Sequence, residues 1–328
     1  MLLTLETIKD IARGCARIEE NDGMFTLMRF TEKQAQAYLD IGKKDFYNKT
    51  YATSGVRLAF TTDSLKFCFD YKFFGSSSRK FGHFDVYIDG CMKYHFGTEG
   101  LESMQGHAEI PLPGGEKTVE VYFPWSYCAK ISNVTVDDGA TIQGVHRSKT
   151  MICFGDSITH GYDAIHPSLS YASLLGSLLD ADEINKGIGG DIFFPALLEE
   201  AECPDPDYIT VAYGSNDWLK CTREEFEVNC HEFLARLVKL YPTSKKFILS
   251  PIWHCAFDTT SKLGLTVPEQ SARMREICGE YPSLHFIDGA LLTPHRREFY
   301  SDLISHPNET GFAIYAAKLF DEIQKAIN

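Results

Sequence analysis

The pattern of hydrophobic and polar positions changes character twice along the chain. Residues 1–20 place apolar side chains at helical spacing, which predicts a helix at the start. From about residue 24 onward, apolar and polar residues alternate in short runs separated by turn-forming clusters. Because no helical pattern intervenes, we expect a β-sandwich or jelly roll here and exclude a βαβ layout. The predicted strands cover residues 55–60, 65–71, 84–88, 106–110, 118–123 and 129–136.

From about residue 150, short apolar runs alternate with longer segments of helical period. This alternation predicts a doubly wound α/β sheet of about five parallel strands, in a flavodoxin-like order. The stretch between residues 137 and 149 is the expected boundary, which divides the chain into residues 1–143 and 144–328. The predicted strands cover residues 150–154, 183–188, 208–213, 246–250 and 284–287, and the predicted helices cover residues 170–179, 193–202, 223–240, 268–281 and 309–327.

Length and charge narrow the classes of partner. A chain of 328 residues is long enough for two domains, each with its own core. The formal net charge of −13 lies almost entirely in the second half, which argues against nucleic acid or an anionic membrane as partner.

The ten cysteines show no paired spacing, and the first residues show no secretory signal. We therefore expect buried thiols, a reducing compartment and a cytoplasmic location.

Several groups of residues are expected to serve the fold. Most of the many aromatic residues of the first half are expected in the sandwich core. Trp125 lies in a loop and is a better candidate for a ligand or interdomain contact. His83, His95 and His107 fall on different predicted strands, so we expect hydrogen-bonded polar residues and no shared metal site. No metal or cofactor motif is present, because the glycines at residues 187–190 lack the Lys-Ser/Thr of a phosphate-binding loop.

The ends of the predicted parallel strands carry the residues of acyl transfer. Ser157 follows the first strand directly, where the carboxyl edge of an α/β sheet binds ligands. Taken alone, this stretch fits an ordinary strand-to-helix turn with a serine cap equally well. Acyl transfer also needs a base, a group that orients the base, and donors for the oxyanion. His306, Asp302, the Gly190 N–H and the Asn216 amide are the candidates for these roles.

The second half resembles the SGNH/GDSL hydrolases over about residues 148–328. Gly155-Asp156-Ser157 is similar to the family's nucleophile block, and Gly190 to its oxyanion glycine. Gly214-Ser-Asn216-Asp217 and His306-Pro-Asn-Glu-Thr-Gly311 are similar to the third and last blocks. The resemblance implies that Ser157 is the nucleophile, that His306 is the base, and that Ser157, Gly190 and Asn216 hold the oxyanion.

The spacing of the acid departs from the family pattern. The family usually places the acid three residues before the histidine, where this chain has Leu303, while Asp302 stands four before His306. An inserted residue must bulge for the Asp302 carboxylate to reach the imidazole. Three outcomes remain open: Asp302 orients His306, a backbone carbonyl does so and leaves a Ser–His dyad, or another acid substitutes.

Four further residues are candidates for substrate contacts, and two for support. Asp217 and Trp218 adjoin the oxyanion asparagine, and Trp253 follows the fourth predicted strand, whereas Trp125 would reach the cleft from the first domain. His160 is expected in a turn or pocket wall, and Asp156 is expected to anchor the nucleophile turn by hydrogen bonds.

A jelly roll before an SGNH domain resembles the architecture of acetyl-xylan and related carbohydrate esterases. This resemblance implies a carbohydrate-binding-like first domain and a serine esterase that removes O-acetyl or other short acyl groups from oligosaccharides, without a cofactor. Two alternatives remain: a lysophospholipase or acyl-thioesterase, and a carbohydrate-binding protein on an inactive hydrolase scaffold. The sequence leaves the oligomeric state open, a homo-oligomer included.

Overall fold

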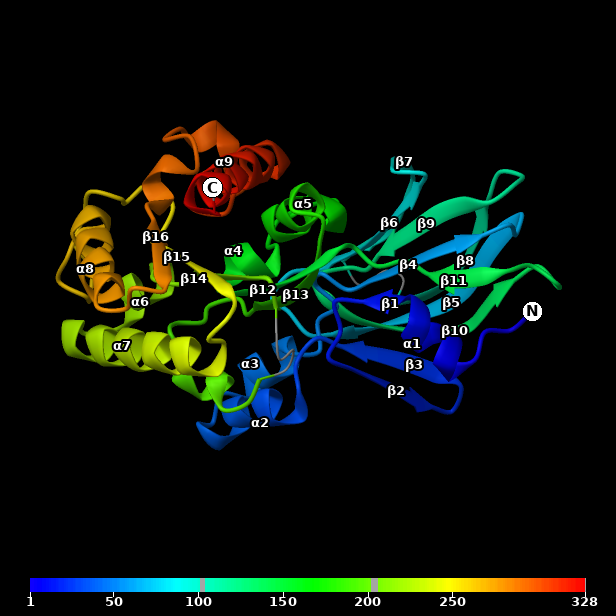
Figure 1. Ribbon diagram of the computed structural model, residues 1–328, viewed down its shortest axis with the longest axis horizontal. Helices are drawn as coiled ribbons and strands as arrows, with labels where there is room; N and C mark the ends of the chain where they lie inside the picture. The colour runs from blue at the N-terminus through cyan, green and yellow to red at the C-terminus, as the bar shows by residue number, and fades with distance from the viewer. Residues whose placement is uncertain (101–103, 202–205, 328) are drawn as a thin grey trace.

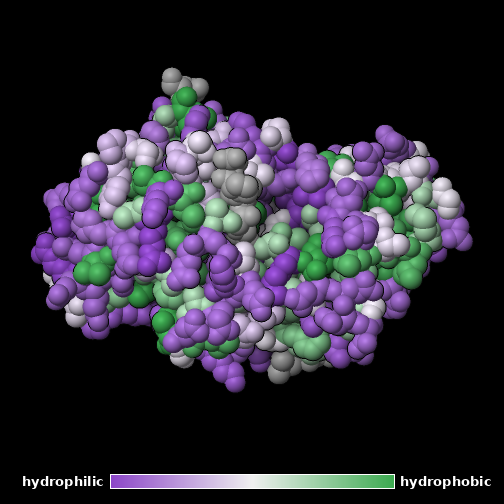
Figure 2. All heavy atoms as spheres, turned by 60° about the horizontal axis from the view of Figure 1, so that its bottom comes forward, coloured by the Kyte–Doolittle hydropathy of each residue, from purple (hydrophilic) through white to green (hydrophobic). Residues whose placement is uncertain are grey.

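The computed structural model describes residues 1–100, 104–201 and 206–327. An antiparallel β-rich N-terminal part lies beside a C-terminal part in which helices surround a parallel sheet (Figure 1). No helix within the described ranges is long and apolar enough to cross a membrane. Figure 2 shows one face of the molecule as mainly hydrophilic, with hydrophobic residues in small separate groups.

Two antiparallel sheets of the N-terminal part enclose one hydrophobic core. Both sheets contribute to it, as Phe69 on β5 packs against Phe84 on β6 with ring centroids 5.4 Å apart. Such sharing of one core defines a sandwich; its jelly-roll connectivity stays a prediction. One sheet has the order β1 (Ala12–Arg13), β4 (Arg57–Thr62), β9 (Lys117–Tyr122), β6 (Phe81–Ile88) and β7 (Cys91–Glu99), with β11 (Ile142–Gly144) also on β4. The other has the order β2 (Arg17–Asn21), β3 (Met24–Met28), β10 (Tyr127–Val136), β5 (Lys66–Gly75) and β8 (Gln105–Pro111).

Five parallel strands form the sheet of the C-terminal part, in the strand order expected from the sequence. Counted along the chain, the order is 2-1-3-4-5, so the first and third strands are neighbours. Their carboxyl ends therefore lie side by side at one edge, where a ligand crevice is expected. The strands are β13 (Ala181–Gly187), β12 (Lys149–Gly155), β14 (Tyr208–Ala212), β15 (Lys245–Leu249) and β16 (Leu284–Ile287).

Helices cover both faces of this sheet because its strands are apolar on both sides. Met151 and Cys153 of β12 join the core under α5 and α9, whereas Ile152 and Phe154 join the core under α7 and α8. The alternation of side chains along a strand assigns them to opposite faces. The helices of this part are α4 (Ser157–His160), α5 (Tyr171–Leu178), α6 (Ser215–Lys220), α7 (Arg223–Leu240), α8 (Val267–Gly279) and α9 (Glu309–Ile327), with 3-10 turns η1 (Pro167–Leu169), η2 (Pro195–Leu198), η3 (Gly289–Leu291) and η4 (Arg297–Phe299).

The prediction for the first 50 residues is wrong in two respects. The initial helix, α1, covers only Leu5–Ile11, and β1, β2 and β3 follow it. Ala12 ends the helix in an extended conformation. Gly14 then makes a turn with a φ of +75°, where a Cβ would lie 2.3 Å from the Gly55 carbonyl oxygen. Helices α2 (Glu32–Asp40) and α3 (Lys44–Lys49) also intervene before β4, although no helix was expected there. The signal for α2 was present in the sequence, since Thr31 and Gln34 form a capping box at its start.

One predicted helix of the second half is also wrong. Residues 193–201 form only the short 3-10 turn η2, and residue 202 lies outside the described residues, as does Cys203. The Phe193 N–H donates to Asp217 Oδ1 at 3.2 Å, and the Phe193 ring packs against Tyr213 and Phe233. These contacts hold the chain extended up to Pro195, so tertiary packing overrides the helical period.

The described cysteines are free, and most are buried, as expected.

Candidate active site

Ser157 stands at the turn where β12 gives way to α4. Asp156 caps the helix, because its Oδ1 accepts the Ile158 N–H at 3.0 Å. Gly155 is required by the close approach of this turn, since a Cβ there would lie 2.1 Å from Thr159 Oγ1. The turn therefore presents Ser157 at the carboxyl edge of the sheet.

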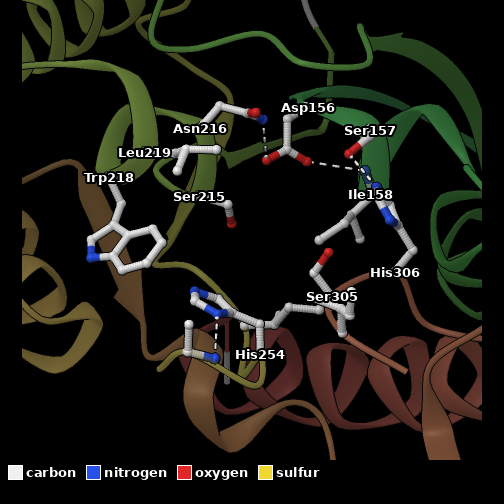
Figure 3. Close-up of a pocket in the computed structure, with 13 residues that line it drawn as sticks. Asp156, Ser157, Ile158, Ser215, Asn216, Trp218, Leu219, His254, Ser305 and His306 are labelled. Carbon is white, nitrogen blue, oxygen red and sulfur yellow. Dashed lines mark hydrogen bonds between the residues drawn. The ribbon is translucent and has the colours of Figure 1, made fainter. Parts of the chain in front are cut away.

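Three predicted residues form one hydrogen-bonded chain. Ser157 Oγ lies 2.9 Å from His306 Nε2, and His306 Nδ1 lies 2.8 Å from Asp302 Oδ2. Figure 3 shows the His306 ring directed at Ser157 across one side of a pocket. An imidazole that contacts a hydroxyl with one nitrogen and a carboxylate with the other is arranged to take a proton from the hydroxyl.

The extra residue between Asp302 and His306 is accommodated by a local bulge. Leu303 adopts a φ of +59°, and its exposed side chain points away from the core. The tight turn brings the backbone N–H groups of Ile304, Ser305 and His306 onto Asp302 Oδ1, at 2.8, 2.8 and 3.1 Å. The Asp302 carboxylate therefore lies beside the His306 imidazole, which is the first of the three arrangements that the sequence left open.

The ionised form of Asp302 is strongly favoured. Partial burial raises the pKa of this carboxyl, but the hydrogen bonds from Ser305, His306 and Ile304 outweigh burial and lower the pKa to about 2. A carboxylate that keeps its charge can stabilise an imidazolium that forms beside it.

Residues that the sequence did not indicate surround His306. The ring of Tyr162 stacks on that of His306 with centroids 5.9 Å apart, and Asp163 Oδ2 lies 3.8 Å from His306 Nδ1. Arg79, from the loop between β5 and β6, donates to Asp163 Oδ1 at 2.7 Å. Only the fold brings Arg79 here, because 84 residues separate it from Asp163.

The predicted oxyanion donors are placed around the same strand ends. Asn216, on α6, lines the pocket with Ser157, and its Nδ2 lies 3.3 Å from Asp156 Oδ2. Gly190 has a φ of +90°, and its carbonyl accepts from Lys220 Nζ at 2.5 Å. The Gly190 N–H has no protein acceptor among the described residues, which leaves it available to an oxyanion. Gly190 itself is not one of the pocket-lining residues.

The loop that carries Gly190 is held by the N-terminal part of the chain. Arg29, fully buried, donates from Nη1 to the carbonyls of Asn185 and Gly187, both at 2.8 Å. Lys49 Nζ donates to the Gly189 carbonyl at 3.0 Å. Nothing in the sequence pattern linked these two basic residues to the site.

His160 supports the same loop and is not a second base. Its Nδ1 accepts the Gly189 N–H at 3.3 Å, so its Nε2 donates to the Trp125 carbonyl at 2.9 Å. Complete burial lowers the pKa of His160 well below its ordinary value, which keeps the ring neutral.

Of the four proposed substrate contacts, the structure places only Trp218 on the pocket. Trp125 is buried between the two parts of the chain and donates from Nε1 to the Ala164 carbonyl at 2.7 Å, so it is an interdomain contact. Trp253 instead packs against His295 and Tyr300, with ring centroids 5.8 and 5.3 Å away.

Asp217 is a buried structural group. Its carboxylate accepts the N–H groups of Phe193 and Gly214, at 3.2 and 3.1 Å, and so fixes the start of α6 that carries Asn216. Burial raises the pKa of Asp217 to about 7, and the nearby carboxylates of Asp191 and Asp156 add to this rise.

The pocket beside Ser157 has a volume of about 300 Å³ and a lining of both apolar and polar residues. The apolar residues are Ile158, Trp218, Leu219, Ile252, Ala256 and Ile304, and Ser215, His254 and Ser305 add polar groups. Sequence reasoning missed His254, whose ring faces the pocket in Figure 3. Its Nδ1 accepts the Ala256 N–H at 3.2 Å, which leaves Nε2 as a hydrogen-bond donor toward the pocket.

Comparisons with known proteins place part of the chain in a known family. Residues 153–314 match the model of the GDSL-like lipase/acylhydrolase family. No protein in a search of curated sequences matches the chain.

Solved structures share the whole architecture at low sequence identity. A salicylyl-acyltransferase from a tetracycline biosynthetic pathway is 22% identical with a TM-score of 0.79, over 96% of this chain and 94% of that one. A family two carbohydrate esterase from Clostridium thermocellum, in complex with cellohexaose, is 14% identical with a TM-score of 0.67, over 84% of this chain and 94% of that one. An acetyl xylan esterase from the rumen bacterium Butyrivibrio proteoclasticus is 15% identical with a TM-score of 0.64, over 97% and 96%. These likenesses concern the fold, which the present chain shares along nearly its full length.

The family match covers the nucleophile turn, the Gly190 loop, Asn216 and the Asp302–His306 segment in one stretch. Residues 153–314 thus match the GDSL-like lipase/acylhydrolase family, and this part of the chain carries the residues expected of a carboxylic ester hydrolase.

Proposed function

We propose that the protein is a serine esterase that removes acetyl or other short acyl groups from a sugar or oligosaccharide through an acyl-enzyme. The observation that carries this proposal is the chain from Ser157 through His306 to Asp302 at a pocket lined by both apolar and polar residues. The apolar residues suit an acyl group, and the polar residues suit hydroxyl groups.

In the proposed reaction, Ser157 Oγ attacks the ester carbonyl while His306 Nε2 takes its proton. The Ser157 and Gly190 N–H groups and the Asn216 amide hold the oxyanion of the tetrahedral intermediate. His306 then protonates the leaving alcohol, and the acyl group stays on Ser157. Water activated by His306 attacks this ester and releases the carboxylic acid, which regenerates the serine.

Division of the chain at residues 143 and 144 is part of the same proposal. The N-terminal domain would support the catalytic one, since Arg29, Lys49 and Trp125 contact its loops. A carbohydrate esterase of similar fold is known in complex with cellohexaose, which supports an oligosaccharide as the class of substrate.

The test is acetate release from a panel of acetylated oligosaccharides, with Ser157→Ala as the matched control. We expect turnover by the parent protein and none above background in the variant, together with labelling of Ser157 by a fluorophosphonate probe. Turnover by Ser157→Ala near the parent rate would refute the mechanism. Oligosaccharide binding without turnover or labelling would favour the inactive-scaffold alternative.

Chain length on nitrophenyl esters separates the two esterase hypotheses. An optimum at two to four carbons is expected, and an optimum at about eight carbons or longer would favour a lysophospholipase or thioesterase. Transfer to an alcohol is a second candidate activity, favoured by the fold shared with a salicylyl-acyltransferase. Formation of a new ester when a sugar or small alcohol is added to the assay would reveal it.

A further inference from the structure

A cluster of histidines and carboxylates lies between the two parts of the chain, outside the active site. Asp85 on β6 and His95 on β7 come from the sandwich, and His166 comes from the loop before η1. One ligand atom from each of these three residues lies within 4.8 Å of the other two. In Figure 1, β6 and β7 lie on the same side of the molecule as α5 and α9.

Strand register and loop packing create this cluster. Asp85 and His95 are directly paired in the β6–β7 ladder, so their side chains emerge on one face. The His166 ring packs on the His95 ring with centroids 4.1 Å apart. The expectation that the histidines of the first half serve separate roles considered neither Asp85 nor a histidine from the second half.

Two carboxylates hold the imidazoles in place. Asp85 Oδ1 lies 2.7 Å from His95 Nδ1, and its Oδ2 accepts the N–H and hydroxyl of Ser168 at 3.0 and 2.6 Å. Glu309 Oε1 lies 2.7 Å from His166 Nδ1, which leaves Nε2 of that ring for another partner. Glu309 thus holds the Nδ1 side of His166, which is the usual way in which a carboxylate orients a metal-binding histidine.

The charges of the cluster are not balanced by arginine or lysine. Asp85 is completely buried, yet among the described residues neither Asp85 nor Glu309 has a Lys or Arg within ion-pair distance. A buried carboxylate needs a compensating positive charge. One divalent cation between the two rings would compensate both carboxylates.

An unpartnered polar group lies beside the cluster. The ring of His83 lies 4.6 Å from that of His95, centroid to centroid. Its Nδ1 is buried and has no hydrogen-bond partner among the described residues. An imidazole nitrogen left without a partner is a costly feature unless it has a ligand to meet.

We propose that Asp85, His95 and His166 form a site for Zn²⁺ or a similar divalent transition-metal ion, with Glu309 orienting His166. Imidazole and carboxylate ligands suit Zn²⁺, and a water molecule would complete a tetrahedral shell. Binding of the ion releases the proton between Asp85 Oδ1 and His95 Nδ1 to the solvent. These two atoms then move apart by a few tenths of an ångström, to the separation of two zinc ligands. The site joins the sandwich to the loop after α4 and, through Glu309, to the start of α9.

The test is a Zn²⁺ titration of the full-length protein after treatment with EDTA, read by competition with a chromophoric chelator. We expect one zinc ion per chain. His95→Gln and His166→Gln should each weaken binding at least 10-fold, and Glu309→Gln about 10- to 100-fold. Saturating zinc should raise the thermal midpoint of the parent protein but not that of His166→Gln. Circular dichroism and retained esterase turnover show that the glutamine variants are folded.

Two control variants separate this site from other possible zinc ligands. His107→Gln alters a histidine that also pairs with an aspartate, Asp70 at 2.6 Å, and His306→Ala removes the catalytic imidazole. Both should bind zinc like the parent protein. Absence of stoichiometric binding would overturn the proposal, and so would binding that is lost in either control but unchanged in His166→Gln.

Discussion

Replacement of Asp302 by asparagine tests how His306 is oriented. The two carboxylate oxygens of Asp302 have different tasks: Oδ1 accepts three backbone N–H groups, and Oδ2 contacts His306 Nδ1. The amide of asparagine has one acceptor and one donor end. Its oxygen should remain on the three N–H groups, because an NH₂ group there would meet three donors at once.

The NH₂ group of the variant then faces His306 Nδ1. This nitrogen must become an acceptor, so the proton of the neutral ring moves to Nε2, which lies 2.9 Å from Ser157 Oγ. An imidazole in this tautomer has no lone pair to take the serine proton. In the Ser-His-Asp template, the same change of tautomer lowers kcat about 10⁴-fold. We therefore expect a loss of about 10³- to 10⁴-fold in kcat, or roughly 4–5.5 kcal/mol of transition-state stabilisation.

The assay is steady-state hydrolysis of a nitrophenyl acetate or acetylated sugar. We expect KM to change little, since Asp302 is not one of the pocket-lining residues. The thermal midpoint should also change little, because the bulge keeps its three backbone hydrogen bonds. Asp163→Asn is the matched control, as this carboxylate lies 3.8 Å from His306 Nδ1 and should matter less than 10-fold. Retention of more than about a tenth of kcat by Asp302→Asn would refute the assignment, and a larger loss in Asp163→Asn would transfer the role to that residue.

Three further variants test the supports of the site. Gly190→Ala, at a φ of +90°, should displace the oxyanion N–H and lower kcat about 10²-fold. The control Gly264→Ala, at a φ of +76° in open space, should leave kcat unchanged. Equal kcat values for the two variants would contradict the role of Gly190 as an oxyanion donor. Arg29→Met should cost about 3 kcal/mol or more in urea unfolding, because it removes the donor from four buried carbonyls, and a loss below about 1 kcal/mol would refute this account. The exposed control Arg223→Met should change stability by less than about 0.5 kcal/mol. Burial raises the pKa of Asp217 to about 7, so the stability it contributes is full below its ordinary value and is lost as pH rises through 7. The unfolding free energy of the parent protein should therefore fall relative to Asp217→Asn between pH 4 and 7, and parallel curves would exclude this titration.

The sequence was sufficient to predict the strands of the parallel sheet and to single out the candidate catalytic residues. Strands that are apolar on both faces stand out as short continuous runs, and helices such as α7 and α9 keep their period over many turns. Ser157, Asn216 and His306 could be found because each occurs at a strand end or helix entrance within a recognisable block. The predicted helix over 193–202 failed because the contacts of Phe193 with Tyr213, Phe233 and Asp217 outweigh local propensity. The substrate role proposed for Trp125 found no support in its location, because burial depends on packing that a loop sequence does not encode.

The sequence by itself determined which chemical groups the protein carries and where along the chain they lie, because strand and helix periods and short motifs are local properties. Only the tertiary structure decided how these groups are held. Leu303 in a left-handed conformation restores the contact between Asp302 and His306, and Arg29 crosses from the N-terminal part to the Gly190 loop. The same is true of Asp85, His95 and His166, which strand register and loop packing bring together from both halves of the chain. Contacts between residues so far apart follow from the way whole sheets and loops pack, and no local pattern specifies them.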